Sequence, residues 1–149
     1  MAFDVERLLR LWTDPLPEDD GAAAEAFREL YTDPVTVNGA QVSAADMVAR
    51  ARAVQGVFAD VEREVLEVAD AGDRVAVAFR MGGPQVGTWT TSAGPMPASG
   101  QEFWLRVIDV LTLADGRITD IVMVADELGV LVALDAVRLR TGADAVAGD

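Results

Sequence analysis

Three residue types that carry much of enzyme chemistry are missing from this 149-residue chain: cysteine, histidine and lysine. Without cysteine there is no disulfide, no thiolate nucleophile and no cysteine-type metal site. Without histidine there is no imidazole base or imidazole metal ligand, and without lysine there is no Schiff base. Proton transfer therefore has to use aspartate, glutamate, bound water or Tyr31, the single tyrosine.

Positive charge is also scarce. The chain has 12 basic residues, all arginine, against 25 acidic ones, which gives a formal net charge of −13. Such a charge repels nucleic-acid backbones and anionic lipid, so we expect neither nucleic acid nor membrane as a partner. No run approaches the ~20 apolar residues of a membrane span, and the N-terminus lacks the pattern of a secretion signal. The sequence thus predicts a cytoplasmic protein.

The size and composition fit one domain. Hydrophobic residues make up 51% of the chain, which is enough for a sizeable core, and we expect a single domain over residues 1–149 with 141–149 as a flexible tail. The acidic turn at 18–20 has no fixed metal-loop pattern, and the glycines do not form a phosphate loop. We therefore expect no metal and no cofactor.

The first part of the chain has helical spacing. Apolar residues at i, i+3, i+4 and i+7 predict a helix over 5–12, and a second apolar series predicts one over 23–31. A short strand is expected at 35–39. Ser43 with Asp46 three residues later resembles a capping box, which opens a third helix through about Gln55.

The second part reads as a meander of strands. β-Branched and alternating segments predict strands over 61–69, 74–81, 88–92, 103–113 and 118–125, with hairpin turns at Gly72-Asp73 and Asp115-Gly116. Residues 93–100 read as a loop, and 127–140 as a closing helix. Helices followed by a meander predict an α+β fold, an antiparallel sheet with helices on one side.

Several short sequence motifs, in this order along the chain, resemble those of the SnoaL-like polyketide cyclases. They are the segments Phe58-Ala59-Asp60, Gly72-Asp73-Arg74-Val75-Ala76-Val77, Gly87-Thr88-Trp89, Pro97-Ala98-Ser99-Gly100, Asp115-Gly116-Arg117-Ile118 and Asp126-Glu127-Leu128-Gly129. The resemblance runs from about Leu30 to Leu134. It implies the nuclear-transport-factor-2-like superfold: a cone-shaped, curved, mostly antiparallel sheet wrapped by N-terminal helices and a C-terminal helix, enclosing a pocket. It also implies a homodimer.

The sequence also departs from that family. Trp89 stands where the family commonly has histidine, and Val122 where it often has tryptophan. The strand around Asp109 is similar to one in ketosteroid isomerases, and this likeness gives Asp109 the place of a protonated, hydrogen-bond-donating aspartate, an effect for which that enzyme is a known example. The base position of those isomerases falls near Asn38 or Gly39.

The resemblance implies a cofactor-independent acid–base enzyme, a cyclase or isomerase acting on a small, hydrophobic, oxygenated, polyketide-like substrate. One alternative is an epoxide hydrolase or epoxide-opening enzyme of the same superfold that uses Asp109, Asp126 and Arg106. The other is a non-catalytic module for ligand binding or dimerisation. An enzyme should direct both aspartates into a closed cavity, with at least one raised pKa, whereas a binding module should have them salt-bridged or capping.

Asp109 and Asp126 are the candidate catalytic residues. The strand around Asp109 is apolar on both faces, so its carboxyl should enter low-dielectric surroundings that raise its pKa. If the turn at 115–116 joins a regular hairpin, position 109 lies opposite 122, so that 109, 122, 124 and 126 share one face. That places Val122 and Val124 in the substrate site. Each aspartate could instead have a purely structural role. Asp109 could accept hydrogen bonds that stabilise the sheet, and Asp126 could be a helix N-cap.

Five further residues are candidates for substrate binding. Trp89 and Trp12 have aromatic side chains that could line a ligand pocket or pack in the core. Tyr31 lies near the expected cavity mouth or belongs to the core. Asn38 either orients a substrate carbonyl or shapes a turn. Arg106 falls on the face opposite Asp109, where it forms a salt bridge, contacts another subunit or binds an anion.

Overall fold

The computed structural model describes residues 2–142. The helices within this range are α1 (Val5–Thr13), α2 (Asp20–Arg28), α3 (Ala44–Val57) and α4 (Glu127–Ala133). The strands are β1 (Tyr31–Val37), β2 (Ala40–Val42), β3 (Glu62–Asp70), β4 (Arg74–Pro84), β5 (Trp89–Thr91), β6 (Gly94–Met96), β7 (Glu102–Ala114) and β8 (Arg117–Ala125). No helix of the described range is long and apolar enough to cross a membrane.

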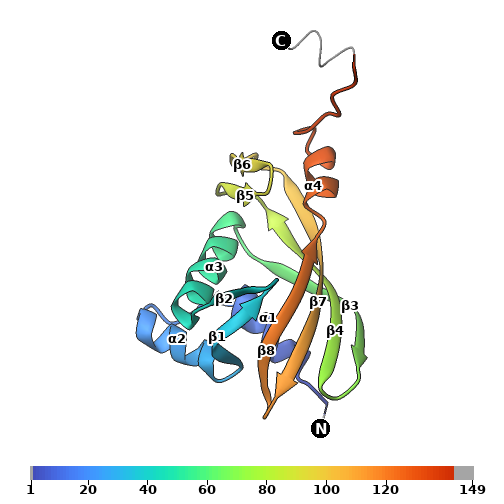
Figure 1. Cartoon of the computed structure of the whole chain (residues 1–149). Coiled ribbons are helices and arrows are strands. Elements are labelled where there is room, and N and C mark those ends of the chain that lie inside the picture. Colours follow the sequence, from blue (N-terminus) through green and yellow to red (C-terminus); the bar gives the residue numbers. More distant parts are fainter. Residues whose placement is uncertain (1, 143–149) are drawn as a thin grey trace.

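Six strands form one curved sheet in the order β2-β1-β8-β7-β4-β3 (Figure 1). Every neighbouring pair is antiparallel except β1 and β8, which run parallel. β5 and β6 form a separate hairpin at the end of the molecule where α4 lies. This arrangement confirms the predicted α+β, mostly antiparallel cone.

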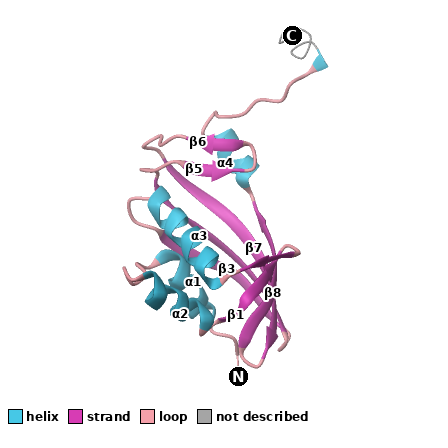
Figure 2. Cartoon of the chain, turned by 60° about the vertical axis from the view of Figure 1, so that its left-hand side comes forward, coloured by secondary structure: helices cyan, strands magenta, loops and turns pink. Residues whose placement is uncertain are grey.

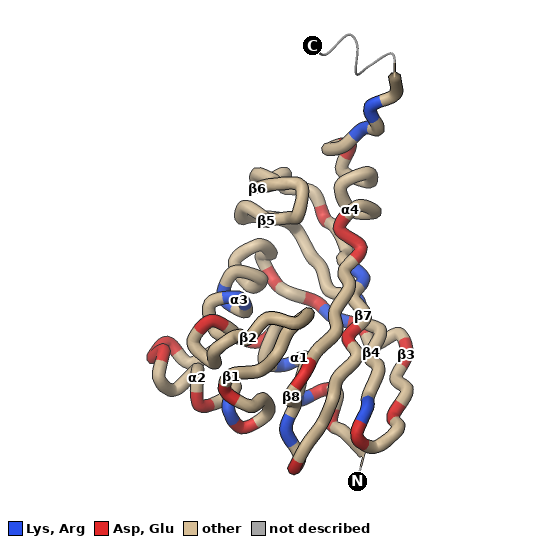
Figure 3. Tube along the Cα trace, viewed as in Figure 1, with Lys and Arg blue, Asp and Glu red and all other residues tan. Residues whose placement is uncertain are grey.

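Helices α1, α2 and α3 cover one face of the sheet and leave the other face bare (Figure 2). The main core lies between these helices and the concave face, and its fully buried side chains come from both layers, among them Leu8, Phe27, Met47, Val77 and Leu111. Helix α3 begins where its predicted cap lies: the Ser43 hydroxyl accepts from the Asp46 backbone N–H at 3.1 Å. Acidic residues are spread over helices and strands, while the β5–β6 hairpin carries no charge (Figure 3).

Two predicted helices end early. Tyr31 begins β1, because pairing with Ile118 of β8 overrides the helical spacing of residues 23–31. The predicted helix 127–140 ends at Ala133, where Asp135 has a positive φ of 55° and Ala136 donates its N–H to the Leu131 carbonyl. These bonds close a Schellman motif, which ends a helix. Of the predicted tail 141–149, residues 143–149 lie outside the described range.

Gln85 organises the loop that follows β4. The predicted loop 93–100 in fact contains β6, and the completely buried amide of Gln85 holds it in place. Its Nε2 donates to the carbonyls of Gly87, Met96 and Pro97, and its Oε1 accepts from the N–H and hydroxyl of Ser99. A buried amide with all its bonds made fixes the hairpin against the sheet.

We expect Gln85→Met to lower the free energy of unfolding by about 2–4 kcal/mol, because the thioether fills similar space but leaves several buried polar groups without partners. Urea unfolding followed by tryptophan fluorescence measures the change. Gln101→Met is the matched control, since that side chain is exposed. A loss below about 0.5 kcal/mol for Gln85→Met would contradict the organising role.

Candidate functional site

A cavity of about 250 Å³ opens between α1, α3 and the concave face of the sheet. Its lining is mostly apolar and comes from both layers: Leu8, Leu9, Trp12, Tyr31, Val37, Met47, Arg50, Val54, Phe79, Met81, Leu105, Val107, Asp109, Ile121, Met123, Ala125 and Glu127. The size and lining are those of a site for a small hydrophobic molecule held by a few polar groups.

The β7–β8 hairpin decides which side chains reach this cavity. Asp115 and Gly116 both have positive φ and form the predicted two-residue turn. The register then shifts between Thr112 and Leu113, because Thr119 is an extra residue on β8. Beyond this bulge Asp109 pairs with Met123, not with Val122. A one-residue slip moves every following side chain to the other face.

The predicted shared face of 109, 122, 124 and 126 is therefore wrong. Val122 and Val124 are 60% and 69% exposed on the outer face of the sheet, and Met123 and Ala125 line the cavity in their place. Asp126 is not among the lining residues. The carboxylate pair predicted from the sequence is not assembled.

Asp109 reaches the cavity from the middle of β7. Its Oδ1 atom is buried and has no hydrogen-bond partner in residues 2–142. Burial among apolar neighbours raises the pKa of Asp109 to about 7, because a low-dielectric environment disfavours the charged form. The carboxyl can therefore hold or release a proton near neutral pH.

Tyr31 lines the same cavity as Asp109 and is 2% exposed. The Trp12 indole N–H donates to the Tyr31 hydroxyl oxygen at 2.9 Å, and the Tyr31 ring stacks on Phe27 at 5.6 Å between centroids. Burial raises the pKa of Tyr31, the Trp12 bond lowers it in part, and the Asp109 charge raises it further. Tyr31 therefore keeps its proton. Since Trp12 occupies a lone pair, the hydroxyl can donate that proton to a ligand.

Two charged residues complete the lining. Arg50 extends from α3, and Glu127 is the first residue of α4. The Glu127 carboxylate accepts from the Ser92 hydroxyl at 2.6 Å and from its backbone N–H at 3.3 Å. This contact ties the β5–β6 turn to the start of α4.

Asp126 caps α4. Its Oδ1 accepts from the Gly129 backbone N–H at 2.9 Å, and a Cβ at position 129 would overlap its carboxylate. The Asp-x-Leu-Gly motif is thus a helix cap, in which the glycine has no Cβ to clash with the capping carboxylate.

Three other predicted substrate contacts lie outside the cavity lining. Trp89 packs on Phe103, 4.8 Å between ring centroids, in a separate apolar cluster that holds the β5–β6 hairpin. Arg106 lies on the outer face, as predicted, and is therefore separated from Asp109 by the sheet. The Asn38 amide donates to the Met123 carbonyl at 3.2 Å and accepts from its N–H at 2.9 Å, so Asn38 positions the strand opposite Asp109.

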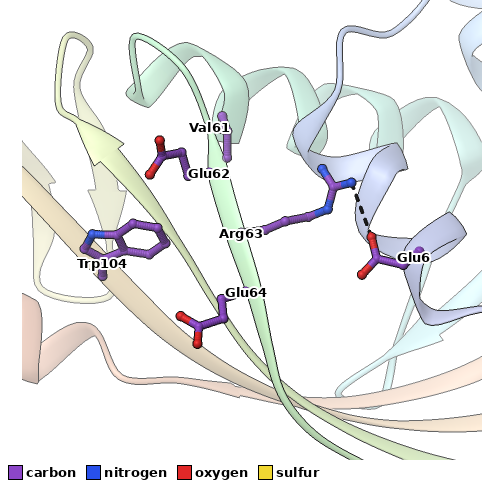
Figure 4. Close-up of a pocket in the computed structure, with 6 residues that line it drawn as sticks. All are labelled: Glu6, Val61, Glu62, Arg63, Glu64 and Trp104. Atoms are coloured by element: carbon purple, nitrogen blue, oxygen red, sulfur yellow. Dashed lines mark hydrogen bonds and ion pairs between the residues drawn. The ribbon is translucent and has the colours of Figure 1, made fainter.

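A second hollow lies outside the cone, at the edge strand β3 (Figure 4). Glu62 and Glu64 point toward Trp104, whereas Arg63 points the other way and pairs with Glu6 of α1 at 3.4 Å. These side chains do not converge on one centre. Among the described residues no group of three or more acidic side chains could hold a metal ion.

Sequence reasoning missed Arg50 and Glu127, along with most of the apolar lining. A signal for Arg50 existed, because Met47, Arg50 and Val54 follow each other at helical spacing and all line the cavity. Leu105 and Val107 could have been inferred from Asp109 by strand alternation. Met123 could not, since its orientation depends on the bulge.

The sequence and the fold are similar to those of known proteins. The family model for SnoaL-like polyketide cyclases matches residues 6–134. TsrD from Streptomyces laurentii has a similar structure, with a TM-score of 0.71 at 19% identity, over 89% of this chain and 92% of TsrD. A SnoaL-like polyketide cyclase from Agrobacterium tumefaciens superposes with a TM-score of 0.67 at 13% identity, over 87% and 93%.

A protein from Jannaschia sp. CCS1, assigned to the same group of cyclases, has a TM-score of 0.65 at 26% identity, over 90% of this chain and 92% of that one. No curated protein matches the sequence. The family model covers most of the chain, and the cone with its internal cavity agrees with it. The chain belongs to the SnoaL-like polyketide cyclase family.

Proposed function

We propose that the chain is a cofactor-independent acid–base enzyme that moves a proton on a small, hydrophobic, oxygenated substrate during cyclisation or isomerisation. The observation that carries this proposal is the buried Oδ1 of Asp109, which has no partner in residues 2–142 although it faces a cavity. An unpaired buried carboxyl destabilises a fold, so its presence in a cavity favours a functional role.

Asp109 has the protonation behaviour that such chemistry needs. A pKa of about 7 leaves comparable amounts of carboxylate and carboxylic acid at neutral pH. The carboxylate form abstracts a proton next to a carbonyl, and the acid form returns it at another position. Because the chain has no histidine, this carboxyl replaces the usual imidazole.

Tyr31 supplies the second polar contact. Removing a proton beside a carbonyl puts negative charge on the carbonyl oxygen, and a hydrogen-bond donor at that oxygen stabilises the charge. Tyr31 lines the same cavity, and Trp12 fixes its hydroxyl oxygen from the other side. In our proposal Tyr31 donates to the substrate oxygen while Asp109 exchanges the proton.

The alternative of a non-catalytic binding module is partly supported by Asp126, which caps α4 as that reading expects. Asp109 favours the enzyme, because it faces the cavity without a salt bridge and has a raised pKa. Epoxide opening by Asp109, Asp126 and Arg106 has less support, since Arg106 lies on the outer face and Asp126 caps a helix. The family favours a polyketide-like ligand.

We expect the protein to accelerate exchange of the α-protons of an enolisable bicyclic ketone such as 2-tetralone in D₂O, followed by proton NMR. Asp109→Asn should slow this exchange by about 100-fold or more, because it removes the proton acceptor. Tyr31→Phe should slow it by about 10- to 100-fold, through loss of one hydrogen bond to the developing oxyanion.

Asp120→Asn, on an exposed position of β8, is the matched control for a lost carboxylate. Asp126→Asn tests whether Asp126 acts as a cap or as a catalytic group, because asparagine still caps a helix but cannot exchange the proton. If Asp126→Asn abolished exchange while Asp109→Asn left it intact, Asp109 would not be the acid–base group.

Asp109→Asn should also make the protein more stable above pH 7. The folded protein holds the Asp109 proton up to about pH 7, whereas the unfolded chain loses it near pH 4. Stability therefore falls as the pH rises from about 4 to 7, and the whole penalty is present above 7. We expect Asp109→Asn to gain about 1–3 kcal/mol at pH 8 and little at pH 4. Equal urea midpoints at pH 8 would contradict this.

We further propose a homodimer formed through the outer face of the sheet. Val110 lies opposite Val122, and Ile108 lies opposite Val124, so that four apolar side chains form one exposed block. Ala76 and Ala78 extend it onto β4. An apolar patch over three strands is typical of a surface buried against another protein.

Val124→Glu should convert this dimer to a monomer, because two like charges would meet in an apolar contact. Light scattering coupled to size-exclusion chromatography measures the mass. The control is Leu139→Glu, since Leu139 is 90% exposed beyond α4, away from the sheet face. A wild-type protein that is monomeric at micromolar concentration would overturn the dimer.

A further inference from the structure

Helix α3 places an arginine on the side that faces the cavity. Met47, Arg50 and Val54 lie at i, i+3 and i+7 and all contribute to the lining. Met47 is fully buried, whereas Arg50 is exposed, so this face of the helix runs from the interior to the solvent.

The Arg50 guanidinium has no partner. Within residues 2–142 it forms no ion pair and no hydrogen bond; the same holds for the side chains of Arg10, Arg106 and Arg138, but of these four only Arg50 lines the cavity. Arg52, two positions further along α3, is paired by contrast: it bonds to Asp20 at 3.1 Å and to the Pro17 carbonyl at 2.8 Å. An arginine without a carboxylate partner at the edge of a cavity has its N–H donors free for a bound molecule.

Glu127, another charged residue of the lining, forms no ion pair with Arg50. Glu127 is more than ion-pair distance from it and accepts its hydrogen bonds from Ser92. Arg50 is also the one cation among the described residues that line the cavity. The lining therefore has a guanidinium that pairs with no carboxylate at its exposed edge and a desolvated carboxyl, Asp109, within it.

We propose that Arg50 binds a carboxylate of the substrate, so that the cavity takes an organic acid with an apolar body. A guanidinium matches a carboxylate through two parallel hydrogen bonds. The apolar body then fills the space between Met47 and Phe79, and the reacting carbon lies near Asp109. This inference rests on the proposed function and adds the substrate class to it.

Two probes of nearly equal shape test the inference: 2-naphthoate, which is charged, and 2-acetylnaphthalene, which is neutral. Calorimetric titration at pH 6 and low salt gives both dissociation constants, under conditions where naphthoate is ionised and most Asp109 is protonated. The wild-type protein should bind naphthoate about tenfold more tightly than the ketone. Added salt should reduce this preference.

Arg50→Gln should remove the preference and leave affinity for the ketone within about twofold, whereas Arg50→Lys should keep part of it. Arg52→Gln is the matched control, since it removes an arginine of the same helix that is already paired. It should behave as wild type.

Equal binding of the two probes by the wild type, binding of neither, or a naphthoate preference that survives Arg50→Gln would each overturn the inference. The proposed function fails in a different way, through an Asp109→Asn variant that exchanges ketone protons as fast as the wild type. The two failures are distinguishable, because ketone exchange requires no carboxylate on the probe.

Discussion

The single extra residue in β8 is the constraint on which the site depends. Thr119 shifts the register of the β7–β8 hairpin by one, so that Asp109 shares its face with Met123 and Ala125, not with Val122 and Val124. Without the bulge, the alternation of β8 would turn two valines inward and two cavity-lining residues outward. Asn38 supports this register, because its amide makes two hydrogen bonds to the Met123 backbone.

This register leaves one carboxyl in apolar surroundings without a partner. Other buried polar side chains have partners: Gln85 makes five side-chain hydrogen bonds, and the Tyr31 oxygen accepts from Trp12. The contrast makes Asp109 informative, because a fold that pairs its other buried polar groups leaves this one facing a cavity. Burial then brings its pKa to about 7 in a chain without histidine.

Much of the fold could be predicted from the sequence, because its signals are local. Helical spacing located α1, and a cap residue located the start of α3; the Asp115-Gly116 turn located the last hairpin. The site was predicted less well. A bulge depends on the pairing of two whole strands, and no local pattern marks Thr119. Trp89 was assigned to the pocket from its place in a motif, but it packs on Phe103 elsewhere. Asp126 was predicted to be catalytic, with a helix cap as the structural alternative; it caps α4, and its partner Gly129 explains the motif.

The central claim is that Asp109 exchanges a proton near neutral pH because it is buried without a partner. Carbon-13 NMR of protein labelled at the aspartate carboxyls measures this directly, with Asp109→Asn identifying the resonance. We predict that the Asp109 carboxyl titrates with a pKa of about 7, well above the value of about 4 for an aspartate in an unfolded chain. A titration of Asp109 near pH 4 would contradict the account, because the carboxyl would then be solvated or paired, and no longer suited to return a proton at neutral pH.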